Sequence, residues 1–80
     1  MRIISQNKNM NLSLDHIHLS TAVSPNCWSI RARDSLWNRP VELAVYSSKE
    51  KCNRVFADIV TACSKGFAVV ELPPDDEVIL

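Results

Sequence analysis

The stretch that decides the fold is SSKEKCNRVFADIVTACSKG, residues 47–66. Its apolar residues recur at i, i+3, i+4, i+7, i+8 and i+11, which is the spacing of one face of an α-helix. These positions are Cys52, Val55, Phe56, Ile59, Val60 and Cys63. The pattern predicts an amphipathic helix that turns all of these side chains, both cysteines included, toward the core.

Both ends of this helix carry boundary signals. Ser47 is followed three residues later by Glu50, a pairing typical of a capping box that satisfies free backbone N–H groups in the first turn. Lys65 suits the negative end of the helix dipole, and Gly66, the only glycine, can adopt the left-handed conformation that ends a helix.

The segments on either side of the helix favour β-strands. Residues 41–46 alternate in polarity after Pro40. Residues 67–72 are rich in β-branched and aromatic side chains and end at Pro73-Pro74, which supply no backbone donors. Short links between strand, helix and strand predict a right-handed crossover with the two strands parallel.

The first half of the chain predicts shorter strands. Residues 2–5 and 28–33 fit single strands, and Ser24-Pro25-Asn26 fits a turn before the second of them. Residues 12–21 alternate, but with a change of phase near Asp15. Side chains alternate strictly along an uninterrupted strand, so the phase change predicts two short strands or one bulged strand.

Together these elements define the expected fold. The length of 80 residues suits a single domain, 1–80. We predict an α+β fold in which a small antiparallel sheet of four or five strands packs on one amphipathic helix, in the order ββββαβ.

Charge bears on the choice of partner. Nine Lys and Arg balance nine Asp and Glu, so the chain lacks the overall field that attracts nucleic acid or anionic lipid. The basic segment 31–54 nevertheless keeps a nucleic-acid-binding regulatory protein as an alternative. Trp28 should lie on the strand face opposite Arg31 and Arg33, and we expect Trp37, with Leu36, to cover the core.

Cysteine usage and the first residues bear on location. Three cysteines cannot all pair within the chain, which fits a reducing compartment. Residues 1–6 lack the apolar run of a secretory leader, and no stretch approaches the roughly 20 apolar residues of a membrane span. We therefore expect a cytoplasmic protein without a membrane partner.

Two histidines and one cysteine are the candidates for chemistry. His16 and His18 lie at i, i+2 on one strand face, and Cys27 beyond the next turn would add a third zinc ligand or a nucleophile. A metal-binding protein through His16 and His18 is therefore a second alternative. No metal or catalytic motif backs these residues, and the single glycine argues against a phosphate-binding loop. We expect no enzyme, and assign no catalytic, cofactor-binding or metal residues and no cofactor.

Three segments carry a resemblance. They are MRIISQ at 1–6, YSSKEK at 46–51 and LPPDDEV at 72–78. In this order they resemble a group of small uncharacterised proteins of Gram-positive gut bacteria and their prophages. The resemblance implies the same order of elements and a bacterial or prophage cytoplasmic origin, but no functional residues to transfer. Asn7-Lys8-Asn9 replaces the usual Asp-Gly turn, and the loop with Trp37 is atypical of the group.

The remaining hypothesis concerns protein binding. Without a constellation for catalysis or cofactor binding, the sequence favours a non-enzymatic accessory protein acting by protein–protein interaction. An open sheet edge, an exposed sheet face or a homo-oligomer would provide the surface.

Overall fold

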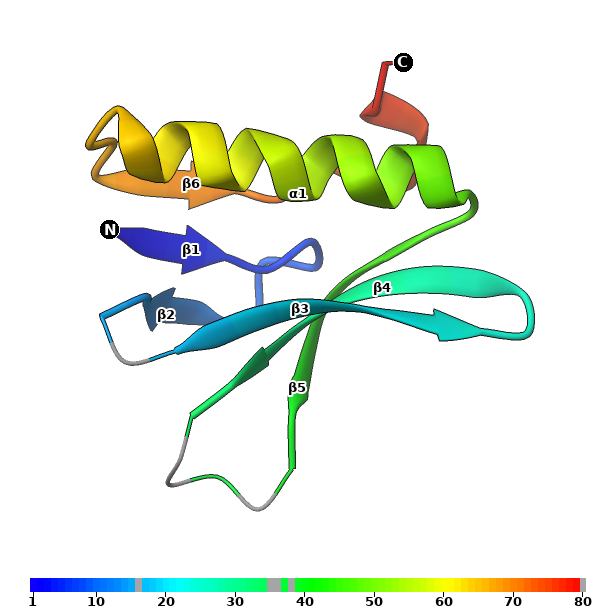
Figure 1. The fold of residues 1–80 in the computed structure, drawn as a ribbon, viewed down its shortest axis with the longest axis horizontal. Coiled ribbons are helices and arrows are strands. Elements are labelled where there is room, and N and C mark those ends of the chain that lie inside the picture. The colour runs from blue at the N-terminus through cyan, green and yellow to red at the C-terminus, as the bar shows by residue number, and fades with distance from the viewer. Residues whose placement is uncertain (16, 35–36, 38, 80) are drawn as a thin grey trace.

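A computed structural model describes residues 1–15, 17–34, 37 and 39–79 of the chain. The elements follow in the order β1 (Arg2–Ile4), β2 (Asn11–Ser13), β3 (His18–Ser24), β4 (Cys27–Arg33), β5 (Val41–Tyr46), α1 (Lys49–Ser64), β6 (Val69–Glu71) and a 3₁₀ turn, η1 (Asp75–Glu77). The α+β class is confirmed. The order ββββαβ in one sheet is wrong, because five of the described strands precede the helix and the strands form two sheets (Figure 1).

The larger sheet surface is an antiparallel meander in the order β3-β4-β5. The β3–β4 hairpin turns at Pro25-Asn26, as predicted, with Ser24 opposite Cys27 and His18 opposite Arg33. Between β4 and β5 the register shifts, so that Ile30 pairs with Ala44 and Arg31 with Glu42. Leu43 has no partner on β4, which marks a β-bulge in β5.

The second sheet has the order β2-β1-β6, in which β1 is antiparallel to β2 and parallel to β6. The phase change near Asp15 is explained, because β2 and β3 are two short strands in different sheets. The predicted crossover between β5 and β6 within one sheet is wrong. Gln6 occupies the outer edge of β5, where its backbone N–H donates to Leu43 O at 2.8 Å, and β6 pairs with β1 instead.

The N-cap of the helix lies one residue later than predicted. Ser48, not Ser47, is the N-cap, and its hydroxyl accepts a hydrogen bond from the Lys51 N–H at 3.2 Å. The predicted capping box of Ser47 and Glu50 is therefore wrong. The predicted stop is confirmed, because Gly66 follows the helix with φ of 74°.

The buried stripe of α1 is narrower than the sequence predicts. It consists of Cys52, Val55, Ile59 and Ala62. Cys63 and Val60 are exposed, so their predicted burial is wrong, and Phe56 is only half-buried. A sheet of three strands covers one narrow face of a helix, and the residues next to that face extend past its edge.

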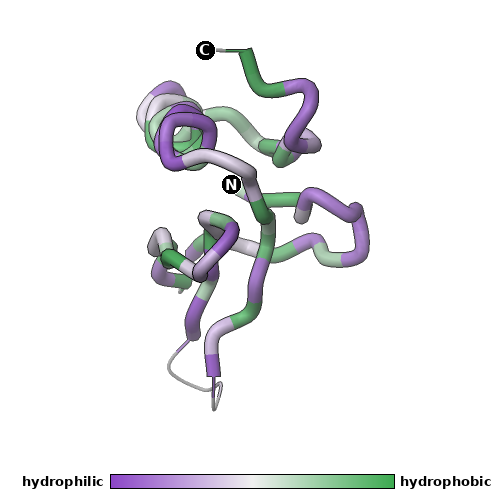
Figure 2. The backbone as a smooth tube through the Cα atoms, turned by 90° about the vertical axis from the view of Figure 1, so that its right-hand side faces the viewer, coloured by the Kyte–Doolittle hydropathy of each residue, from purple (hydrophilic) through white to green (hydrophobic). Residues whose placement is uncertain are grey.

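The core lies where the helix and the two sheets meet (Figure 2, with α1 seen end-on). Ile3 from β1, Ile30 from β4, Tyr46 from β5 and Leu72 after β6 are almost completely buried there. Trp37 packs against the rim of this core, as predicted, while Leu36 lies outside the described residues. Over the described part of the chain, no helix is long and apolar enough to cross a membrane.

Candidate interaction surface

An apolar groove lies between α1 on one side and, on the other, the start of β3 with the segment before it. Its volume is about 390 Å³. The helix contributes Phe56, Ile59, Val60, Cys63 and Ser64, and the opposite wall is formed by Leu14, Ile17 and Leu19. With the exception of Ser64, every lining residue is apolar or a thiol. The groove is therefore suited to an apolar side chain and offers little to a polar or charged ligand.

Two local features of the sequence produce this groove. Phe56, Val60 and Cys63 are spaced i, i+4 and i+7, so they form a second apolar stripe beside the buried one. On the other wall, Leu19 is the second residue of β3, whereas Leu14 and Ile17 come from the segment between β2 and β3. β3 is the last strand on that side of its sheet, so no further strand covers this second stripe of the helix among the described residues.

The outer edge of β3 adjoins the groove and is uncovered. Among the described residues no strand pairs with this edge, although β3 is seven residues long. Its sequence HLSTAVS has no Lys, Arg, Asp, Glu or Pro. Val23 on β3 is 72 % exposed. Natural proteins usually protect an edge strand with charge, proline, a bulge or a covering segment, and β3 shows none of the first three.

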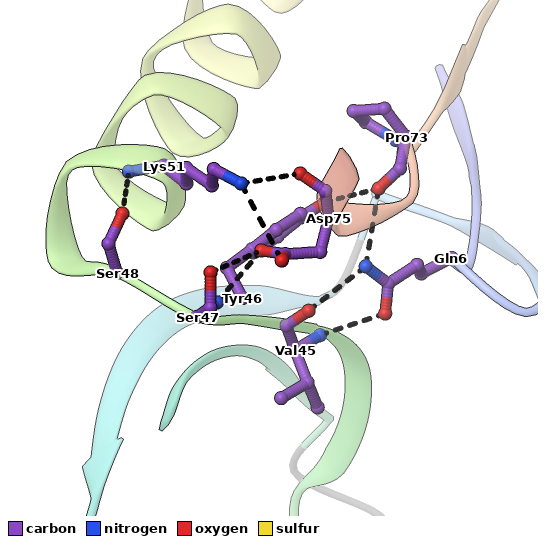
Figure 3. A network of polar contacts seen from close by, with 8 residues as sticks. All are labelled: Gln6, Val45, Tyr46, Ser47, Ser48, Lys51, Pro73 and Asp75. Atoms are coloured by element: carbon purple, nitrogen blue, oxygen red, sulfur yellow. Dashed lines mark hydrogen bonds and ion pairs between the residues drawn. The ribbon is translucent and has the colours of Figure 1, made fainter. Parts of the chain in front are cut away.

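The opposite edge of the same sheet, on β5, is closed by the side chain of Gln6 (Figure 3). The Gln6 amide donates to Val45 O at 3.0 Å and accepts from Val45 N–H at 3.1 Å. The same Nε2 also donates to Pro73 O at 3.3 Å. Gln6 therefore replaces a further strand at β5 and leaves this edge less able to pair with another chain.

A polar network fixes the segment after β6 to the start of the helix. Asp75 Oδ1 accepts from the Ser47 N–H at 2.8 Å and from the Ser47 hydroxyl at 3.1 Å. Lys51 Nζ donates to Asp75 O at 2.9 Å and lies 3.6 Å from Asp75 Oδ2. The buried Tyr46 hydroxyl donates to Pro73 O at 2.8 Å. Because the polar groups of Tyr46, Lys51 and Asp75 bond one another or the nearby backbone, we assign the network a structural role.

The pKa values within this network follow from its contacts. Hydrogen bonds from the Ser47 N–H and hydroxyl, and then the Lys51 ammonium, hold the pKa of Asp75 below its usual range. Burial, then the neighbouring Cys52 and Asp75, raises the pKa of Tyr46. Burial also raises the pKa of the Cys52 thiol. Tyr46 and Cys52 are thus kept neutral, which does not suit either for nucleophilic chemistry.

Among the described residues, the basic side chains of segment 31–54 come from separate elements, chiefly β4 and α1. Arg31 and Arg33 lie on the outer face of β4, and Arg31 is in register with Glu42. Lys51 pairs with Asp75, and Arg54 Nε lies 3.5 Å from Asp58 Oδ1. The predicted position of Trp28 on the opposite face is confirmed, because Trp28 packs against the core. Trp28 therefore does not lie beside these arginines, where its ring could stack on a nucleic-acid base.

Two of the residues considered for the alternative zinc site, His18 and Cys27, lie far apart. His18 and Cys27 occupy opposite ends of the β3–β4 hairpin, since His18 pairs with Arg33 and Cys27 with Ser24. The two pairs are six residue steps apart along the strand, which is roughly 20 Å. Cys27 therefore cannot join His18 in a metal site or act as its nucleophile. His16 lies outside the described residues, among which no group of three His, Cys, Asp or Glu could hold a metal.

Comparison of the chain with protein-family models, curated proteins and solved structures gives no significant match. The functional reading therefore depends on the surface itself. Sequence reasoning missed the structural roles of Gln6 and Asp75 and the exposure of Val23. The uncharged, proline-free run at 18–24 was the available signal for an unprotected edge.

Proposed function

We propose that the chain is a non-enzymatic protein-binding module whose docking surface is the groove together with the adjoining edge of β3. The observation that carries the proposal is their adjacency. The groove offers an apolar pocket, and the edge offers backbone donors and acceptors to an extended segment. Backbone pairing supplies affinity in such complexes, and side-chain pockets supply selectivity.

The location of the module is part of the proposal. Cys27, Cys52 and Cys63 are all free thiols, of which Cys63 is exposed in the groove. Free thiols persist in reducing compartments. We therefore place the module in the cytoplasm of a bacterial cell, in agreement with the resemblance of the sequence to small bacterial and prophage proteins.

The experiment selects peptides from a random library on the chain immobilised at low density, where copies do not meet. Enriched peptides should shift the NMR signals of Leu19 and Val60 and lose binding to Val60→Glu. Ala57→Glu, on an exposed part of the same helix, is the matched control and should leave binding unchanged. Enrichment that is equal on Val60→Glu, or shifts confined to another surface, would contradict the proposal.

A further inference from the structure

We infer that the partner at this surface is a second copy of the chain, paired antiparallel through β3 about a two-fold axis at Thr21. This inference rests on the proposed function, whose docking surface it supplies with an occupant. It begins from the edge itself, because Thr21 is the central residue of His18–Ser24 and is exposed. A two-fold axis there opposes Thr21 to itself and lets the whole strand pair.

The side chains of β3 are self-complementary in this register. Leu19 of one copy lies opposite Val23 of the other, and the pair repeats across the axis. Residues directly opposite one another project from the same face of a sheet, with Cβ atoms about 5 Å apart. Leu19 lines the groove, whereas Val23 is 72 % exposed. The exposed valine of each copy is therefore placed at the mouth of the groove of the other.

The helices add apolar surface to the same contact. Each helix lies on the sheet face that carries Ile30, and pairing through β3 puts both helices on one face of a continuous six-stranded sheet. Their second stripes, Phe56, Val60 and Cys63, line the groove against Leu19 and so lie on the side of each helix next to the paired strands. Val60 is 52 % exposed in the single chain, which leaves apolar area for the dimer to bury.

Charge is compatible with self-association. Like charges brought into opposition by a two-fold axis would oppose pairing, but β3 carries no Lys, Arg, Asp or Glu. Across the axis, His18 meets Ser24 and Ser20 meets Ala22, so no pair brings two ionisable side chains together. The other edge of this sheet cannot pair in the same way, because the Gln6 amide already bonds Val45.

The test is molar mass by light scattering coupled to size exclusion, over about a hundred-fold range of protein concentration. The wild type should reach twice the 9.0 kDa of one chain. Val23→Lys should remain at one chain mass, and at a dilution where the wild type is monomeric the two unfolding curves should match. Val69→Lys is the matched control, because Val69 is also an exposed valine on an edge strand, β6, and should leave the dimer intact.

A disulfide trap tests the register independently. With Cys27 and Cys63 changed to serine, oxidation of Thr21→Cys should give a covalent dimer in high yield, whereas Thr61→Cys on the exposed helix surface should not. A wild type that stays monomeric, dissociation by Val69→Lys as well as Val23→Lys, or an absent Thr21→Cys dimer would overturn the assignment. If selected peptides still bind the groove of a monomeric wild type, only the second copy is excluded and the proposed function stands.

Discussion

The two edges of the β3-β4-β5 sheet are treated in opposite ways. At β5 the side chain of Gln6 supplies both a donor and an acceptor to Val45. At β3, within the described residues, seven residues of backbone have no neighbour beyond β4. The comparison indicates that this chain closes an edge with a single residue, Gln6, through its side-chain amide and its backbone N–H. The uncovered edge at β3 is therefore the better candidate for a binding surface.

The largest expected effect distinguishes the buried stripe of α1 from the second apolar stripe beside it. Ile59 is 3 % exposed, so Ile59→Ala should cost about 3 kcal/mol of unfolding free energy by leaving a cavity. Val60, its neighbour, is 52 % exposed, and Val60→Ala should change stability by less than about 0.5 kcal/mol. Urea unfolding of both variants at low protein concentration measures this contrast. An equal loss of unfolding free energy in both variants would mean that Val60 is packed as tightly as Ile59.

The next effect concerns the closed edge. Gln6→Ala removes the bonds to Val45 and Pro73 and should destabilise the chain by about 2 kcal/mol. Gln6→Met keeps the length of the side chain but not its hydrogen bonds, and should lose nearly as much. Thermal unfolding compares the three proteins. Wild-type stability in Gln6→Met would show that packing, and not the amide, closes this edge.

A smaller effect should appear at acidic pH. The pKa of Asp75 is lowered in the folded state by the Ser47 hydrogen bonds and Lys51. A lowered folded pKa gives stability that is present above the unfolded carboxyl pKa and is lost as pH falls through the folded value. The melting temperature of the wild type should therefore fall more than that of Asp75→Asn between about pH 5 and pH 2. If the melting temperatures of the wild type and Asp75→Asn fall equally with pH, the Asp75 carboxylate does not contribute to stability.

The smallest perturbation uses the native thiols. Cys63 in the groove is exposed, whereas Cys52 is buried and its thiol pKa is raised by burial. A thiol reagent should therefore label Cys63 quickly and Cys52 only on unfolding. Labelling followed by mass spectrometry at low and high protein concentration sharpens the comparison, because covering the groove should slow Cys63. Rapid labelling of Cys52 in the folded chain would contradict the buried stripe.

The sequence predicted the helix well because its signals are local. Periodicity placed the helix, and Gly66 marked its end. The cap was misplaced because Ser47 and Ser48 are equivalent candidates in the sequence. Only Asp75, 28 residues away, distinguishes them, since it takes both donors of Ser47 and leaves Ser48 to cap the helix.

The division into two sheets and the groove could not be predicted in the same way. No local pattern shows that the Gln6 side chain will occupy the edge of β5, or that β6 will pair with β1. Likewise, the apolar spacing on α1 is the same whether Val60 and Cys63 are buried or exposed. Their exposure depends on how many strands lie beneath the helix, which is a property of the whole fold.

Amide hydrogen exchange at both edges of this sheet tests the central claim most directly. Alternate amides of β3 point away from β4, so in dilute protein they should exchange rapidly while the Val45 amide, bonded to Gln6, stays protected. Raising the protein concentration should protect the outer amides of β3 and leave Val45 unchanged. Outer β3 amides that are protected in dilute protein, or a Val45 amide that exchanges as fast as they do, would contradict the account of one closed and one open edge.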